Sequence, residues 1–194
     1  MGWARRLGRR KNNGRRPHAP LSSRERGAAV VEVALVAPVF MLMVFATIEY
    51  GFIFNNFNTL RQGTRDGARS ASVNQLNNPG GSPYWCTTTG SPPSGADTNL
   101  ICLIKNRVGL GDANTRVWIS VPSPSGTAPN PVATGDEIVV CTQYLQNSIT
   151  GLFAQWVNGS VLTSRVVLRA EQPSALSTGG ETSVSQGSWT FCTG

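Results

Sequence analysis

The feature that most constrains this 194-residue chain is an apolar run near its N-terminus. From residue 28 to residue 48, only Glu32, Pro38 and Thr47 depart from plain apolar character. Because an α-helix rises about 1.5 Å per residue, a helix of this length extends about 30 Å, the thickness of a bilayer's hydrocarbon core. The run has neither the regular polar positions of a soluble core helix nor a following signal-peptide cleavage site. It therefore predicts a transmembrane segment over residues 28–50.

Two residues of this run need an explanation. Pro38 has no backbone N–H and its ring clashes with the preceding turn, so we expect a kink in the helix near this position. Glu32 places a carboxylate where a charge costs about 2.5–3.5 kcal/mol, and such residues usually have a partner. Two interpretations stay open: Glu32 either reaches water at the cytoplasmic edge or pairs with a cation inside the membrane.

Positive charge is concentrated before the apolar run. Residues 1–27 hold nine Lys or Arg residues and one acid, whereas residues 28–194 hold eight basic and nine acidic residues. A basic segment beside an apolar helix keeps that end of the helix in the cytoplasm. We therefore predict a basic cytoplasmic leader over residues 1–27 and a single-pass topology with an extracytoplasmic body. The same rule explains the net charge of +7 without nucleic acid as a partner.

The helix is expected to continue outside the membrane, over residues 51–76. Small or apolar residues recur there at near-helical spacing: Phe57, Leu60, Thr64, Gly67, Ala68 and Ala71. Gly63 and Gly67 form a small-xxx-small pair that lets a second helix approach closely. Arginines four residues apart form a stripe that is either solvated or meets acids on a neighbouring subunit: Arg61, Arg65 and Arg69.

Residues 77–194 predict a small β-rich head with a Ser/Thr-rich C-terminal tail. Apolar and alternating patterns predict strands at 115–121, 137–144 and 164–171, and a last strand in SWTFCTG at the C-terminus. Residues 100–110 suit a short helix or a strand, and residues 147–159 suit a short helix or a membrane-apposed loop. Segments rich in Asn, Pro, Gly and Ser are expected to be loops: 74–85, 87–99 and 123–136.

All the cysteines follow the apolar run: Cys86, Cys102, Cys141 and Cys192. Disulfides persist outside the cytoplasm and no C-x-x-C spacing occurs, so we predict two disulfides, with one bond and two buried thiols as the alternative. Four cysteines allow three connectivities, and spacing does not choose among them. A Cys86–Cys102 bond would close a surface loop, and Cys192 could fasten the C-terminal segment to Cys141.

Patterns of catalytic or metal-binding groups do not occur. The only histidine, His18, lies in the predicted leader. The sequence has no P-loop, no EF-hand loop and no nucleophile-elbow spacing. We therefore predict no enzyme activity, no cofactor and no metal.

The N-terminal motifs together resemble a known family. RGAAVVEVALVAPVF, then IEYGFIF, then RQGTRDGARSASV are similar to the TadE-like pseudopilins of tight-adherence (Flp-type) pilus systems. The resemblance covers roughly residues 24–73 and includes Glu49, Arg65 and Arg69. A looser C-terminal match, VVLRAE, places Arg169 and Glu171 in an R-x-E motif.

This resemblance implies a fold and a mechanism. The expected fold is α+β, with a long membrane helix extending into a small antiparallel β-sheet head. A prepilin peptidase is expected to cut between Gly27 and Ala28 on the cytoplasmic face of a bacterial membrane. The new α-amino group of Ala28 on an adjacent subunit is then the expected partner of Glu32, where it offsets part of the cost of burying the charge. The other expected partners are pilin or pseudopilin subunits, the pilus assembly platform and membrane lipid.

Two departures from the best-known prepilins favour a minor or assembly role. The leader is long, and Ala28 stands where an aromatic residue or methionine is usual. The alternative function is an uncleaved single-pass anchor that presents an extracytoplasmic binding domain.

Overall fold

The computed structural model describes residues 23–77, 81, 84–88, 95–122, 131–183 and 189–193, with side chains from residue 27 onward. The chain forms two compact units, Met1–Leu42 and Met43–Gly194. Most of the predicted leader, through residue 22, lies outside the described residues, as do parts of the three predicted loops.

The predicted long N-terminal helix is present. Helix α1 (Ser23–Ser72) passes through Pro38 without a break in its assignment, and the kink expected there stays a prediction. Asn74 ends the helix with a φ of 54°, a left-handed conformation that asparagine tolerates. Beside it, the Gln75 N–H donates to the Ser70 carbonyl at 2.8 Å, which satisfies one of the last helical carbonyls.

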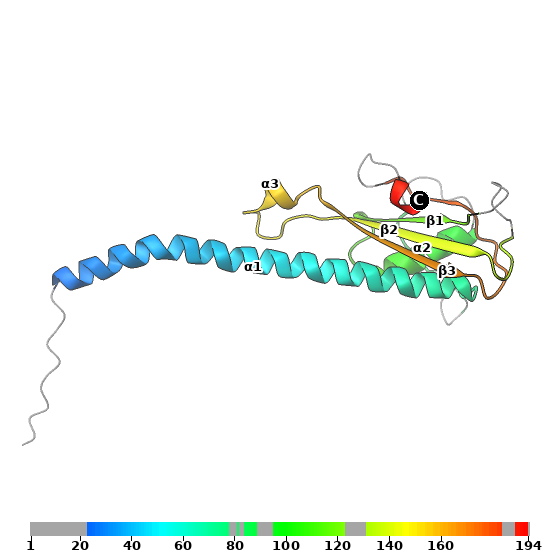
Figure 1. Ribbon diagram of the computed structural model, residues 1–194, viewed down its shortest axis with the longest axis horizontal. Coiled ribbons are helices and arrows are strands. Elements are labelled where there is room, and N and C mark those ends of the chain that lie inside the picture. Colours follow the sequence, from blue (N-terminus) through cyan, green and yellow to red (C-terminus); the bar gives the residue numbers. More distant parts are fainter. Residues whose placement is uncertain are drawn as a thin grey trace, which may run out of the picture. The chain divides into compact units, whose positions relative to one another are not determined.

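The second unit contains a four-stranded antiparallel sheet in the order β3-β2-β1-β4, whose longer strands run lengthwise beside α1 (Figure 1). The strands are β1 (Thr115–Ser120), β2 (Glu137–Leu145), β3 (Val161–Arg169) and β4 (Gly179–Gly180). The three strands predicted from their apolar patterns are thereby confirmed. Strand β2 is paired on both sides, because Cys141 lies opposite Trp118 of β1 and Arg165 of β3.

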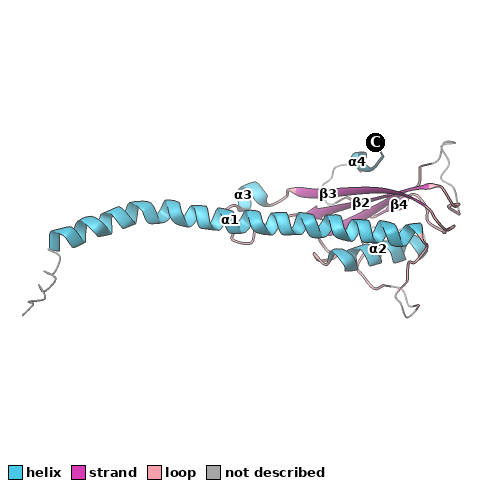
Figure 2. Ribbon diagram, turned by 60° about the horizontal axis from the view of Figure 1, so that its bottom comes forward, coloured by secondary structure: helices cyan, strands magenta, loops and turns pink. Residues whose placement is uncertain are grey.

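Helices cover one face of this sheet. The second half of α1 and helix α2 (Gly95–Val108) lie on the same side, and the short helix α4 (Thr190–Thr193) lies on the other (Figure 2). Alternating apolar residues of β1 and β2 point towards the two helices: Val117, Ile119, Ile138 and Val140. They form the core together with buried residues of α1 and α2: Leu60, Ala68, Leu100 and Ile104. Apolar residues at every second position of the strands therefore pack against an apolar stripe on the helices, where such residues recur about every 3.6 positions.

Helix α2 corrects the prediction that residues 87–99 are all loop, because it begins at Gly95. The first turn of α2, residues 95–99, consists of small and polar residues, which occur both in loops and at the start of helices. Asp97 fixes this turn in place. Its carboxylate accepts hydrogen bonds from the Ser177 N–H at 3.0 Å and the Ser177 hydroxyl at 2.7 Å. Residues 100–110, for which a helix or a strand was expected, are helical through Val108.

The strand expected at the C-terminus is wrong, since Thr190–Thr193 forms helix α4. Its Cys192 is bonded to Cys141 in the middle of β2. Both edges of β2 are already taken by β1 and β3, so a segment attached there can lie only across the face of the sheet. Trp189 packs against that face and stacks on Trp118 with 5.9 Å between ring centroids.

The fourth strand, β4, arises inside the predicted tail. A Cβ atom built on Gly180 would lie 2.5 Å from the Val117 carbonyl oxygen and 2.8 Å from the Trp118 Cα. Only glycine allows the backbone to come this close to β1. The strand is two residues long, and β3 forms the opposite edge of the sheet.

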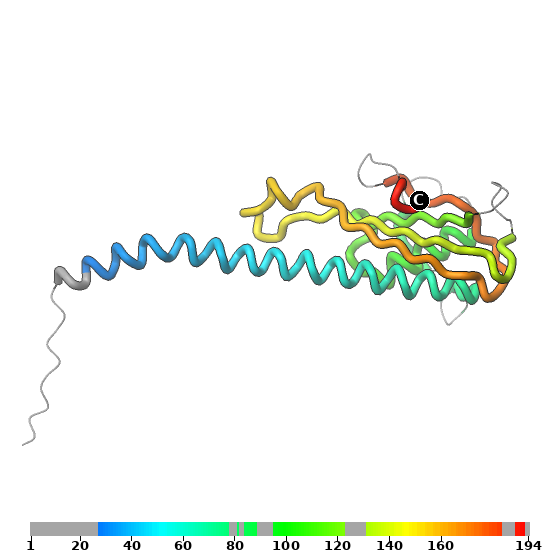
Figure 3. The backbone as a smooth tube through the Cα atoms, in the orientation of Figure 1, coloured from blue at the N-terminus to red at the C-terminus, as the bar shows by residue number. Residues whose placement is uncertain are grey.

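Strands β2 and β3 are joined by the β2–β3 loop, defined here as residues 146–160. It contains the short helix α3 (Ala154–Val157), as the short-helix interpretation of residues 147–159 expected, while the membrane-apposed interpretation stays a prediction. The loop extends past the end of the sheet and lies beside α1 (Figure 3). This places the loop against the part of α1 that follows the apolar run.

Candidate functional site

The described part of the first unit, residues 23–42, is helical, and none of the side chains of residues 27–42 is buried. The chain has one helix apolar and long enough to cross a membrane by length and composition among its described residues, and none of its most apolar window is buried. Glu32 is exposed here. Within the described residues it forms neither a hydrogen bond nor an ion pair, so its expected pairing with an N-terminus stays a prediction.

The predicted cleavage position is helical. Gly27 and Ala28 are exposed and are the fifth and sixth residues of α1. Nothing lies within 4 Å of a Cβ built on Gly27, so packing does not require glycine there. A peptidase needs an extended backbone, and the first turns of a helix open most easily because their N–H groups have no intrahelical partners.

Glu49 is another carboxylate of α1, and its surroundings differ from those of Glu32. Its side chain is 3 % exposed. One carboxylate oxygen accepts a hydrogen bond from the Ile149 N–H at 3.1 Å, and the other accepts from the Thr150 N–H at 3.2 Å and the Thr150 hydroxyl at 2.9 Å. We call this set the Glu49 clamp, because it fastens the β2–β3 loop to α1.

An apolar hollow of about 370 Å³ adjoins the Glu49 clamp. Helix α1 contributes Ala46, Tyr50 and Ile53 to its walls, and the loop contributes Phe153, Trp156 and Val157. A further hydrogen bond, from the Asn56 side-chain amide to Gln146 at 3.0 Å, joins the helix to the start of the loop. The clamp and the hollow together hold aromatic side chains beside the end of the apolar run.

The glycine pair predicted for helix packing faces α2. A Cβ on Gly63 would meet the Val108 Cγ2 atom at 2.5 Å and the Val108 backbone nitrogen at 2.8 Å. A Cβ on Gly67 would collide with the Ile104 side chain. The close contact is therefore made with a helix of the same chain.

Three of the five family-motif residues outside the apolar run surround one groove. Arg65 and Arg69 of α1 and Glu171, just after β3, line a surface hollow of about 540 Å³ that also includes Ser72. The Glu171 N–H donates to the Ser72 carbonyl at 2.7 Å, so the R-x-E segment caps the C-terminal end of α1. No ion pair joins either arginine to Glu171 in the part of the chain that the structure describes.

The other two motif residues lie elsewhere. Glu49 belongs to the clamp, near the middle of α1. Arg169 is exposed on the edge strand β3, opposite Glu137 of β2. The structure therefore separates the five motif residues into a loop anchor, a groove at the end of α1 and a position on the sheet edge.

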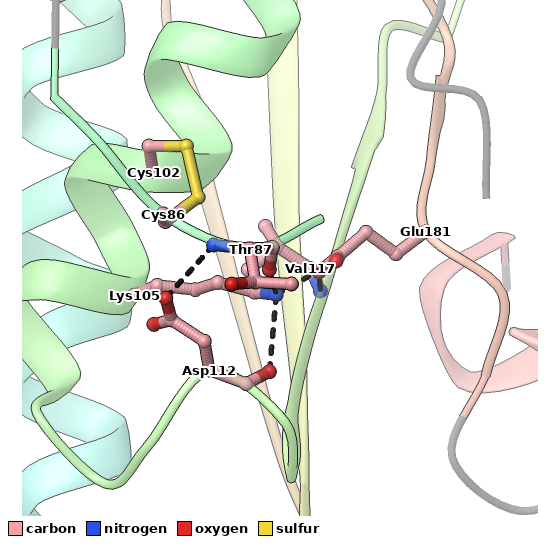
Figure 4. Close-up of a disulfide and its surroundings, with 7 residues drawn as sticks. All are labelled: Cys86, Thr87, Cys102, Lys105, Asp112, Val117 and Glu181. Carbon is pink, nitrogen blue, oxygen red and sulfur yellow. Dashed lines mark hydrogen bonds and ion pairs between the residues drawn. A yellow bond between two sulfur atoms is a disulfide. The ribbon is translucent and has the colours of Figure 1, made fainter. Parts of the chain in front are cut away.

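A buried ion pair escaped the sequence analysis. Lys105 Nζ lies 2.7 Å from Glu181 Oε1, and both side chains are fully buried. Lys105 also donates to the carbonyls of Thr87 and Asp112, while Glu181 accepts from the Val117 N–H at 3.1 Å (Figure 4). These bonds offset the cost of removing two charges from water. The sequence signal was a lysine on the same helical face as Ile101 and Val108, which are buried.

Both predicted disulfides are formed. Cys86 is bonded to Cys102 of α2, beside the buried ion pair (Figure 4), and Cys141 is bonded to Cys192. Two free buried thiols, the alternative kept in the sequence analysis, are excluded because no cysteine is free. The first bond fixes the segment before α2, and the second fixes α4 to the central strand.

The acidic groups do not form a metal site within the described ranges, where no cluster of three or more His, Cys, Asp or Glu residues occurs. The contacts described above join parts of the chain mechanically. The exposed apolar part of α1 continues into the head. Within the head, buried polar contacts hold together the second half of α1, the β2–β3 loop and the sheet.

Comparison with known proteins shows a family match over part of the chain. Residues 27–69 match the family of TadE-like proteins. This match begins at the predicted cleavage position, includes Glu32 and Glu49, and confirms the resemblance found in the N-terminal motifs, whereas the looser match at Arg169 and Glu171 stays a prediction. No curated protein and no solved structure matches the chain.

Proposed function

We propose that this chain, whose residues 27–69 match TadE-like proteins, is a minor pilin or pseudopilin of a tight-adherence (Flp-type) pilus. It is inserted in the bacterial cytoplasmic membrane by the first half of α1, with its leader in the cytoplasm and its head outside. A prepilin peptidase removes residues 1–27. The mature subunit then contributes to pilus assembly together with other pilin or pseudopilin subunits and the assembly platform, and it has no catalytic activity.

The observation that carries the proposal is the exposure of the first half of α1. Its apolar side chains do not pack within the chain, so they need lipid or other subunits around them. Glu32 is exposed on this same segment and is available to a partner. A free α-amino group created by cleavage at Ala28 would provide a cation near the same end of the helix. Pairing the two charges would set the register between neighbouring helices.

Cleavage is tested by intact-mass analysis and N-terminal sequencing of the protein from cells with and without the prepilin peptidase. We expect a mature chain that begins at Ala28 only where the peptidase is present. Gly27→Leu should abolish processing, whereas the matched variant Gly51→Leu should be processed normally. Both glycines are exposed in α1 with nothing within 4 Å of an added Cβ, so the two changes disturb packing equally. An unprocessed chain that still supports pili would contradict the proposal.

Assembly is tested separately with Glu32→Gln. A pilin should lose most of its co-purification with the other pilus subunits, because the charge that pairs with the N-terminus is gone. A simple anchor would tolerate this change, because glutamine has nearly the same shape as glutamate and the substitution removes a charge from the membrane. Unchanged subunit association in Glu32→Gln would favour the uncleaved single-pass anchor over the pilin.

A further inference from the structure

The β2–β3 loop exposes an unusual group of apolar side chains. Ile149 is 56 % exposed, Leu152 51 % and Trp156 68 %. Single exposed apolar residues are common on protein surfaces, but three within eight residues on one loop indicate a contact with something apolar. The loop is not loose, because the Glu49 clamp and the Asn56–Gln146 bond hold it in place.

The clamp fixes the loop at one particular level of α1. The apolar run ends at residue 48, and the next residue is Glu49 itself. A helix over residues 28–48 is about 30 Å long, which equals the thickness of the hydrocarbon core of a bilayer. When that run spans a membrane, the clamp lies at the outer boundary of the core, where Tyr and Trp are enriched. Tyr50 and Trp156 both occupy this level.

The distribution of charge around the clamp agrees with this position. Residues 50–60 of α1 contain no charged side chain, and neither do residues 138–164, which include the entire loop. Charge resumes on α1 only at Arg61, three helical turns above the clamp. Glu49 is the one carboxylate at this level, and two N–H groups and a hydroxyl satisfy it. A carboxylate with its hydrogen bonds already made is tolerated in a poorly hydrated region.

We infer that the β2–β3 loop is a second membrane contact, seated in the interfacial layer of the outer leaflet with Ile149, Leu152 and Trp156 against lipid. Glu49 is the positioning residue that holds the loop at this depth. The inference rests on the proposed function only in requiring that the first half of α1 spans the bilayer. Its consequence is that the head sits on the membrane surface in one orientation before it is drawn into an assembly.

The test is quenching of tryptophan fluorescence by brominated lipid. The full chain, carrying Trp3→Phe to silence the leader, is reconstituted into vesicles of phosphatidylethanolamine and phosphatidylglycerol with bromine on the acyl chains. Trp156→Phe is compared with Trp85→Phe. Trp85 is the matched control because it is 86 % exposed. It lies beside Cys86, whose partner Cys102 is close to the Gly67 level of α1, about 27 Å above Glu49.

We expect brominated lipid to quench the parent protein, and Trp156→Phe to lose most of that quenching. Trp85→Phe should keep all of it. Equal quenching of the parent and Trp156→Phe would overturn the inference. Alkaline extraction of the same vesicles shows whether the chain is integral to the membrane, so a failure of the inference is distinguishable from a failure of insertion.

A second copy of the chain is the competing occupant of this surface. The measurement is therefore repeated at a protein-to-lipid ratio low enough to leave most vesicles with a single copy. Lipid contact predicts that Trp156 stays quenched on dilution. Shielding of Trp156 from aqueous acrylamide that appears only at high protein density, without quenching by brominated lipid, would assign the loop to a subunit interface and overturn the lipid contact.

Discussion

Each half of α1 carries one glutamate among apolar residues, and the two glutamates lie in opposite environments. Glu32 is exposed on a segment whose side chains touch little else in the chain, whereas Glu49 is 3 % exposed and accepts three hydrogen bonds. The same contrast holds for leucines, since Leu35 is 73 % exposed and Leu60 is fully buried. A single continuous helix therefore exposes its apolar side chains in one half and packs them in a protein core in the other.

The difference arises from the spacing of small and polar residues. In the first half, residues 33–46 are apolar on every side of the helix, which leaves no face that prefers water and no groove for a neighbouring element. The second half has Gly63, Gly67, Ala68 and Ala71 on one face, and α2 and the sheet come close against them. Small residues on one face mark where a helix packs against its own chain.

The leucines give the largest expected difference between the halves. Leu60→Ala should destabilise the head by about 2–5 kcal/mol, because it removes a fully buried side chain from the centre of the core. Leu35→Ala should leave head stability unchanged. Chemical denaturation of the protein in nanodiscs, followed by tryptophan fluorescence, measures both. Equal losses in the two variants would mean that the first half also packs within the chain.

Two glycines sharpen the same comparison at a smaller scale. Gly67→Ala should destabilise the head by about 1–3 kcal/mol, because the new methyl group collides with Ile104 of α2. Gly51→Ala should be neutral or slightly stabilising, since its site is open and alanine has the higher helix propensity. The midpoint of thermal unfolding orders the two variants. A stabilising Gly67→Ala would contradict the tight α1–α2 contact.

The glutamates give the smallest and most local effect. Glu49→Gln replaces a charged acceptor by a neutral one, so opening of the β2–β3 loop should become easier by about 1 kcal/mol, or roughly fivefold. Hydrogen exchange of the Ile149 and Thr150 amides should accelerate by that factor. Glu32→Gln should leave these amides unchanged. Unaltered exchange in Glu49→Gln would mean that the carboxylate does not hold the loop.

Residue pattern predicted the elements whose stability depends on periodicity. The packed face of α1 followed from the spacing of Leu60, Ala68 and Ala71, and β1 and β2 followed from their apolar residues. Each of these elements has one buried face, so apolar side chains recur along it with a period of about 3.6 residues in a helix or 2 in a strand.

The remaining features depend on contacts with residues far away in the sequence, and no local sequence pattern predicts such contacts. Glu49 stood out as a motif residue, but its partners include the backbone N–H groups of Ile149 and Thr150, and every residue except proline has one. Lys105 and Glu181 are 76 residues apart, and only the fold brings them together. Strand β4 has no side chains to give it an alternating pattern, because it consists of two glycines.

The sheet edges have a consequence for contacts between copies of this chain. An open strand edge offers unpaired N–H and C=O groups to any identical neighbour and can seed aggregation. One edge here, β4, is two residues long, and the other, β3, carries the exposed arginines Arg165 and Arg169. Two copies that meet edge to edge through β3 would bring like charges together. Both edges therefore disfavour sheet-to-sheet polymerisation of neighbouring heads.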